Sequence, residues 1–224
     1  KGYGRLTMSK NILLVGLGRF GRYTASKLNE LNQEVLAIDK NEEHVNKVLN
    51  YVTNAQIGDS TNYDFMESLG INDFDVCIVA IGDGFLASLE TTALLKELGA
   101  KKVISRATGV SQEKFLLRNG ADEVVFPEKQ LANWTAIHTS ALNISNYIGL
   151  SDGYSIFEIQ TPESWYGKSI LSINVRKMLG INILGIKSNG VMNMTVTADT
   201  VLTEGSSLLA LGREEDLKKL MKLG

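Results

Sequence analysis

The sequence has 224 residues, of which 44% are hydrophobic and 21% charged, which is an ordinary globular composition. This length allows one large domain, or a medium one with a small partner domain. Its formal charge of -2 argues against nucleic acid as a partner, because binding to a phosphate backbone requires an excess of basic residues. No apolar run approaches the roughly 20 residues of a membrane span, and a single cysteine, Cys77, forms neither an internal disulfide nor a cysteine-based zinc site by itself. A cytoplasmic enzyme and a cytoplasmic ligand-binding protein remain.

Residues 1–7 match no periodic pattern, and we interpret them as an expression tag or a disordered lead. From residue 11 onward, short aliphatic runs alternate with stretches of helical period, which is typical of a parallel sheet covered by helices. The expected strands are 11–15, 34–38, 55–57, 76–81, 102–105 and 123–126. The expected helices are 21–30, 41–49, 63–69, 85–98 and 111–119. We therefore predict a Rossmann-like, doubly wound α/β domain over residues 8–130.

Apolar residues then recur every three or four positions from Leu131 to Ile148. This spacing predicts one long helix over 131–150, which either covers the sheet of its own chain or packs against a second chain. Residues 151–224 predict a smaller α+β lobe, whose expected strands are 154–160, 182–187, 191–196 and 206–211 and whose expected helices are 169–178 and 214–221. The dipeptide Asn189-Gly190 lies between two of these strands and predicts a hairpin.

A glycine motif, Gly16-Leu17-Gly18-Arg19-Phe20-Gly21, directly follows the first expected strand and begins the first helix. This context is typical of dinucleotide-binding domains. There Gly16 allows the tight turn, Gly18 lets the backbone approach a pyrophosphate, and Gly21 lets helix and strand pack closely. The free N–H groups at the start of the helix attract the anion.

Asp39 ends the second expected strand, where its carboxylate would accept hydrogen bonds from ribose hydroxyls and repel the 2′-phosphate of NADP. Arg19 brings a positive charge to the phosphates, which favours ADP or ATP over NAD and excludes neither. A dehydrogenase would also need a proton donor or acceptor, but His44 and His138 have no evident orienting partner and Cys77 is expected in a buried strand. An NAD(H)-binding oxidoreductase or NAD(H) sensor therefore remains only as the alternative to a nucleotide-binding regulator.

Several segments together, in their order and spacing, resemble the KtrA- and KtrC-like regulatory subunits of bacterial Ktr potassium transporters, which form the RCK (KTN) family. The segments are residues 15–21, Asp39, Gly58-Asp59-Ser60-Thr61, Ala80-Ile81-Gly82 and Phe126-Pro127-Glu128-Lys129. The resemblance extends from Lys10 to the end, and the second lobe resembles the RCK-C (TrkA-C) domain of this family. It implies a cytoplasmic gating subunit that is not an enzyme. Homodimers would assemble into an octameric ring beneath a membrane potassium channel subunit of the KtrB or KtrD type.

The resemblance also implies one site at which ATP and ADP compete and favour opposite channel states, with NAD or NADH as possible ligands. The residues of this site would be Gly16, Gly18, Arg19, Phe20, Gly21, Asp39, Lys40, Asp59, Ser60, Ala80, Ile81, Gly82 and Arg106. Glu128 would help to place a cation, Mg, Ca or Na, between nucleotides across a subunit interface. In the second lobe, cyclic di-AMP would bind at Ile170, Leu171, Asn174 and Arg176.

Overall fold

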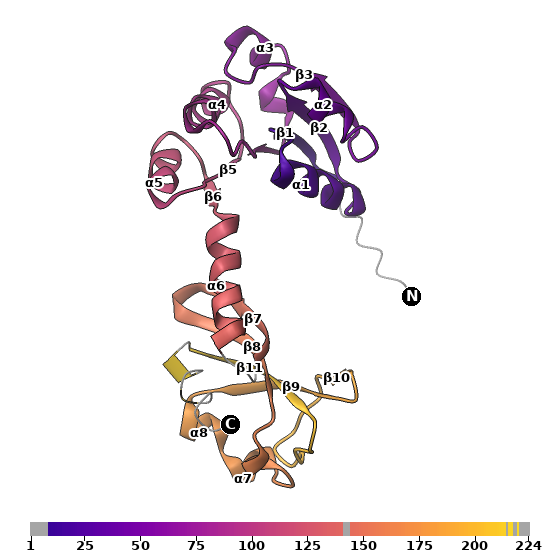
Figure 1. Ribbon diagram of the computed structural model, residues 1–224, viewed down its shortest axis with the longest axis vertical. Coiled ribbons are helices and arrows are strands. Elements are labelled where there is room, and N and C mark those ends of the chain that lie inside the picture. Colours follow the sequence, from indigo (N-terminus) through magenta and orange to yellow (C-terminus); the bar gives the residue numbers. More distant parts are fainter. Residues whose placement is uncertain (1–8, 141–143, 214, 217–218, 220–224) are drawn as a thin grey trace. The chain divides into compact units, whose positions relative to one another are not determined.

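The computed structural model describes residues 9–140, 144–213, 215–216 and 219. The chain forms two compact units, Lys1–Glu128 and Lys129–Gly224, each with a sheet of its own (Figure 1). The interpretation of residues 1–7 lies outside the described residues, as does most of the helix predicted over 214–221.

The first unit contains a six-stranded parallel sheet with the order β3-β2-β1-β4-β5-β6. Its strands are β1 (Asn11–Val15), β2 (Glu34–Asp39), β3 (Asn54–Ile57), β4 (Val76–Val79), β5 (Val103–Arg106) and β6 (Glu123–Val125). Its helices are α1 (Arg19–Glu30), α2 (Glu42–Asn46), α3 (Tyr63–Glu67), α4 (Phe85–Glu97) and α5 (Val110–Arg118), and α6 (Pro127–Ser140) crosses into the second unit. This strand order is that of doubly wound dinucleotide-binding sheets, so the predicted fold class is confirmed.

The central strand β1 shows why its sequence is a continuous aliphatic run. Leu13 and Val15 belong to an apolar core on one face of the sheet that includes Leu94 and Leu95 of α4. Ile12 and Leu14 belong to a second core on the opposite face, which includes Ala25 of α1 and Val45 of α2. Successive side chains of a strand point to opposite faces, so a strand that is covered on both sides has no polar alternation.

The second unit contains a five-stranded antiparallel sheet with the order β10-β9-β11-β8-β7. Its elements are β7 (Ile144–Gly149), β8 (Tyr154–Gln160), α7 (Ile170–Ile173), α8 (Val175–Leu179), β9 (Asn182–Ser188), β10 (Val191–Asn193) and β11 (Ser207–Arg213). The buried side chains Phe157, Ile159, Trp165 and Leu208 form its core together with residues of the two short helices. The hairpin predicted at Asn189-Gly190 joins β9 to β10, and both turn residues have positive φ angles.

The prediction of one long helix over 131–150 is wrong in its second half. Helix α6 ends at Ser140, and Ile144–Gly149 forms strand β7, which pairs antiparallel with β8. The spacing of Ile144 and Ile148 fits a helix, but only Ile144 is buried, whereas Ile148 is 60% exposed. The β-branched and aromatic residues of this segment favour a strand. Apolar spacing alone does not distinguish short helices from strands, so the pairing with β8 determines that this segment is a strand.

The helix predicted over 169–178 is two short helices. Asn174 ends α7 and begins α8, with a left-handed backbone conformation at φ 54°. A left-handed residue cannot continue an α-helix, and asparagine tolerates this conformation better than most residues.

Candidate nucleotide site

A cavity of about 720 Å³ lies in the first unit at the carboxyl ends of β1, β2 and β4. Since β2 and β4 flank β1 on opposite sides, this is the place where the strand order reverses, and doubly wound sheets bind ligands at such a point. The cavity brings together every residue expected at the nucleotide site except Gly21, and Glu128 as well. Its lining also contains residues that the sequence analysis did not assign to this site, Val15, Asn41, His44, Gly58, Asp83, Ala87, Thr108 and Pro127.

The glycine motif forms the loop between β1 and α1. Gly16 has φ +91°, and a side chain there would place its Cβ 2.9 Å from the backbone nitrogen of Ile81. Gly21 lies behind the loop, where a Cβ would come well under 3.0 Å from the carbonyl oxygen of Gly16. At Gly18 a Cβ would meet nothing within 4 Å, since this residue borders the open cavity. The three glycines therefore have different roles. Gly16 allows the turn, Gly21 allows close packing of the helix, and Gly18 leaves the loop open to the cavity.

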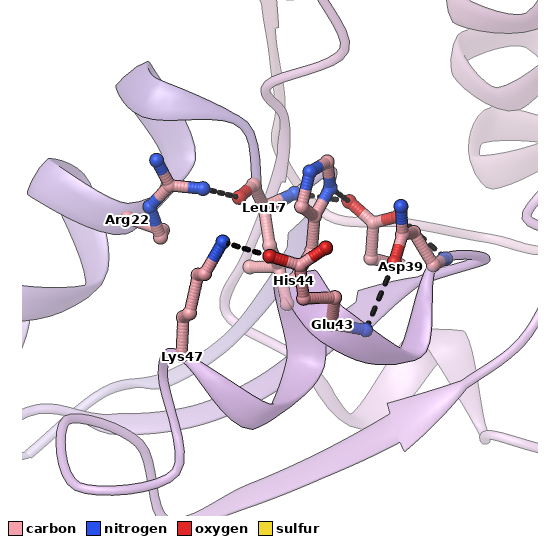
Figure 2. A network of polar contacts seen from close by, with 7 residues as sticks. Leu17, Arg22, Asp39, Glu43, His44 and Lys47 are labelled. Carbon is pink, nitrogen blue, oxygen red and sulfur yellow. Dashed lines mark hydrogen bonds and ion pairs between the residues drawn. The ribbon is translucent and has the colours of Figure 1, made fainter.

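Asp39 at the end of β2 holds this loop in place. Its Oδ2 accepts a hydrogen bond of 2.7 Å from the backbone N–H of Leu17, and its Oδ1 accepts one of 2.8 Å from Asn41. The guanidinium of Arg22 donates to the carbonyl oxygen of Leu17 at 3.1 Å, so the backbone N–H and the backbone C=O of Leu17 are both hydrogen-bonded (Figure 2). A residue expected to bind ribose thus also orients the loop expected to bind phosphate.

The sequence interpretation that His44 has no orienting partner is wrong. The Nδ1 atom of His44 lies 3.2 Å from Oδ2 of Asp39 (Figure 2). His44 also lines the cavity. The sequence could have indicated this contact. Asn41, two residues after Asp39, is a favoured N-cap residue and precedes the first residue of α2. The first turn of that helix therefore returns to the end of the strand.

Arg106 at the end of β5 forms an ion pair with Glu128 at the start of α6. Its guanidinium also lies 5.4 Å from the ring centroid of Phe20, which is within the range of a cation–π contact. Burial acts to raise the pKa of Glu128, but hydrogen bonds to its own backbone N–H and to Arg106, with the charges of Arg106 and Arg19, hold it below its usual value. Within the described ranges, no group of three or more His, Cys, Asp or Glu side chains could hold a metal.

Two further expected residues lie on the loop after β3. Ser60 is 7% exposed, and its hydroxyl lies 2.7 Å from the hydroxyl of Thr91 on α4. Asp59 accepts hydrogen bonds from the backbone and the hydroxyl of Thr61, which lower its pKa. Lys40 is exposed at the rim.

Comparison with known proteins places this architecture in a family. The family models of the TrkA-N domain and the TrkA-C domain match residues 12–127 and 154–223. The chain is 38% identical over 216 residues to Ktr system potassium uptake protein A of Bacillus subtilis, with 96% of this chain and 97% of the relative covered. The chain belongs to the Ktr family of potassium uptake proteins. Ktr system potassium uptake protein C of Bacillus subtilis is 35% identical over 215 residues, with the same shares covered.

Solved structures support the fold of this Ktr family member. The GsuK channel matches 97% of this chain with a TM-score of 0.69 and 21% identity, and this chain covers 40% of the channel. The GsuK RCK domain has a TM-score of 0.65 and 19% identity. The match covers 97% of this chain and 48% of the GsuK chain. In the part of the Ktr chain that the structure describes, every helix is too short or too polar to pass through a bilayer.

The Ktr chain has a second cavity, of about 430 Å³, in its second unit. It brings together the four residues expected to bind a second ligand, Ile170, Leu171, Asn174 and Arg176. The left-handed Asn174 is the joint between α7 and α8, and both helices contribute to the lining. Sequence alone indicated these residues only through the resemblance, because their spacing is also that of an ordinary surface helix.

Proposed function

We propose that this chain is the nucleotide-responsive gating subunit of a bacterial potassium uptake system. One observation carries the proposal: in a member of the Ktr family, the glycine loop and the acid that ends β2 face one cavity at the switch point of the sheet. Such a subunit needs no chemical step. It has to bind one nucleotide better in one conformation than in the other, since only this difference moves a conformational equilibrium.

Adenosine di- and triphosphates are the ligands that we propose for this cavity. The loop offers backbone N–H groups for phosphate, Arg19 adds a positive charge at the start of α1, and Asp39 offers a carboxylate oxygen to the ribose. Each tenfold difference in affinity between two states supplies about 1.4 kcal/mol per site, and a ring of identical sites adds these contributions. NAD or NADH fits the same loop and is the competing ligand.

A cation, Mg, Ca or Na, is proposed to bind at Glu128. A single carboxylate does not hold such an ion, so the remaining ligands would be phosphate oxygens and groups of a neighbouring subunit. The ion pair with Arg106 sets a condition on this site, because Glu128 has to share its charge between the guanidinium and the ion.

We further propose that the chain forms homodimers that assemble into an octameric ring at the inner face of the cell membrane, in contact with a membrane potassium channel subunit. The exposed side chains of Leu131 and Trp134 on α6 support a contact between subunits. Apolar side chains of this size in one stripe commonly mark an interface.

Cyclic di-AMP is the ligand that we propose for the cavity of the second unit. Asn174→Gly is a suitable test, because glycine adopts the left-handed conformation and only the side-chain amide is lost. We expect weaker binding of cyclic di-AMP to this variant with unchanged thermal stability. Equal binding by the variant and the wild type would remove Asn174 from the site.

The decisive experiment is a thermal-shift titration of the purified chain with ATP, ADP, NADH and cyclic di-AMP, followed by potassium flux measurements with the chain and its channel subunit in vesicles. Ligands that bind the folded state raise the melting temperature, and at equal concentration the increase grows with the logarithm of the affinity. We expect stabilisation by ATP and ADP and different flux with each. Stabilisation by NADH alone would favour the oxidoreductase or NAD(H) sensor instead.

A further inference from the structure

The ring of His44 lies against the carboxylate proposed to bind the ribose. The Nδ1 atom of His44 and the Oδ2 atom of Asp39 are 3.2 Å apart, and the Asp39 side chain is 12% exposed (Figure 2). An ionised carboxylate only accepts hydrogen bonds, so the proton of this contact is on Nδ1 of the ring. Of the charged groups nearby, Lys47 pairs with Glu43 and Arg22 donates to the carbonyl oxygen of Leu17.

The hydrogen bonds of Asp39 determine how much of it a ligand can use. A carboxylate offers about two acceptor positions on each oxygen. Among the described residues, Oδ2 accepts from both Leu17 and His44, whereas Oδ1 accepts from Asn41 alone. One acceptor position, on Oδ1, is therefore left for a ribose that carries two neighbouring hydroxyl groups.

We propose that His44 determines ribose recognition by holding the carboxylate of Asp39 so that it accepts only one of the two ribose hydroxyls. His44 is thus a positioning residue, which acts through Asp39. The proposal rests on the proposed nucleotide site. Without the imidazole, Oδ2 regains an acceptor position, and each oxygen can then accept one hydroxyl.

The test measures calorimetric affinities of the full chain for ATP, 2′-deoxy-ATP and 3′-deoxy-ATP. The wild type should discriminate between the two deoxy analogues by about tenfold or more, since only one of them lacks the hydroxyl that Asp39 accepts. His44→Leu removes the donor but keeps an apolar side chain at this half-buried position, and its discrimination should fall below about threefold. His44→Asn is the matched control, because its amide nitrogen can take the place of Nδ1, and it should retain the wild-type ratio.

Several outcomes would overturn the proposal. They are a wild type that binds both analogues equally, a His44→Leu variant with the wild-type ratio, and a His44→Asn variant that behaves like His44→Leu. An equal loss of affinity for all three nucleotides in His44→Leu would show a structural role only. A wild type that binds none of the three would refute the proposed ATP site itself, and this proposal with it.

Discussion

The two glycines at the start of α1 should fail in different ways when each is replaced by alanine. At Gly21 the new Cβ would come well under 3.0 Å from the carbonyl oxygen of Gly16, a separation that real Cβ atoms essentially never show. Both atoms are fixed to the backbone, so the start of α1 has to move away from the loop. Gly18→Ala is the matched control, because its Cβ would meet nothing within 4 Å and its φ of -61° suits any residue.

The magnitude for Gly21→Ala follows from two opposing contributions. Overpacking costs about 1–3 kcal/mol, and the upper value applies here because neither atom can rotate away. Alanine is favoured over glycine inside a helix by about 1 kcal/mol, which leaves a net loss of about 2 kcal/mol. At about 2–4 °C per kcal/mol, the melting temperature should fall by about 4–8 °C. For Gly18→Ala, at the N-cap position of α1, we expect a smaller loss of about 0.5–1 kcal/mol.

Nucleotide binding should depend directly on Gly18 and only indirectly on Gly21. The methyl group of Gly18→Ala would stand between the loop N–H groups and the phosphates and lower ATP affinity at least about tenfold in a protein of near-normal stability. Differential scanning calorimetry and titration calorimetry measure the two quantities. A Gly21→Ala variant at least as stable as the wild type would refute the packing argument, and a Gly18→Ala variant with full affinity would refute the assignment of the loop to phosphate.

Three further predictions concern groups outside the loop. A hydrogen bond from the Ser207 hydroxyl lowers the pKa of Glu158, although burial acts to raise it. The contribution of Glu158 to stability is therefore complete above the ordinary pKa of 4.5 and is lost as the pH falls below that value. Glu158→Gln should lower the unfolding free energy by about 1.5–3 kcal/mol at pH 7 and flatten its decline in acid, measured by urea unfolding with Trp165 fluorescence in a Trp134→Phe background; a parallel decline would contradict this. Burial raises the pKa of Cys77 to about 12, so the native thiol should resist a disulfide reagent at pH 8 and react fully only in guanidinium, and rapid native labelling would contradict its placement. Arg106→Lys should weaken nucleotide binding although the charge is kept, because lysine has no planar group to lie over Phe20 and pair with Glu128, and calorimetry showing unchanged affinity would argue against a role for this geometry.

The sequence alone was sufficient to predict the sheet and the glycine loop between β1 and α1, for a local reason. A strand buried on both faces must be continuously apolar, and a loop that turns tightly, packs a helix and admits a ligand must carry glycine at three set positions. Such requirements act between residues that are close in the chain, so they remain visible without coordinates. The same holds for the hairpin at Asn189-Gly190, whose two positive φ angles few other residue pairs adopt.

Contacts between distant segments were decided by the tertiary structure. Strand β7 has a spacing that also fits a helix, and only its pairing with β8 makes it a strand. Arg106 meets Glu128 because β5 ends and α6 begins at the cavity, and no pattern in either segment specifies the partner. The sequence singled out Asp39 as the acid that ends β2, but the folded chain decides which of its oxygens keeps an acceptor position for a ligand, because hydrogen bonding depends on where Leu17, Asn41 and His44 lie around it.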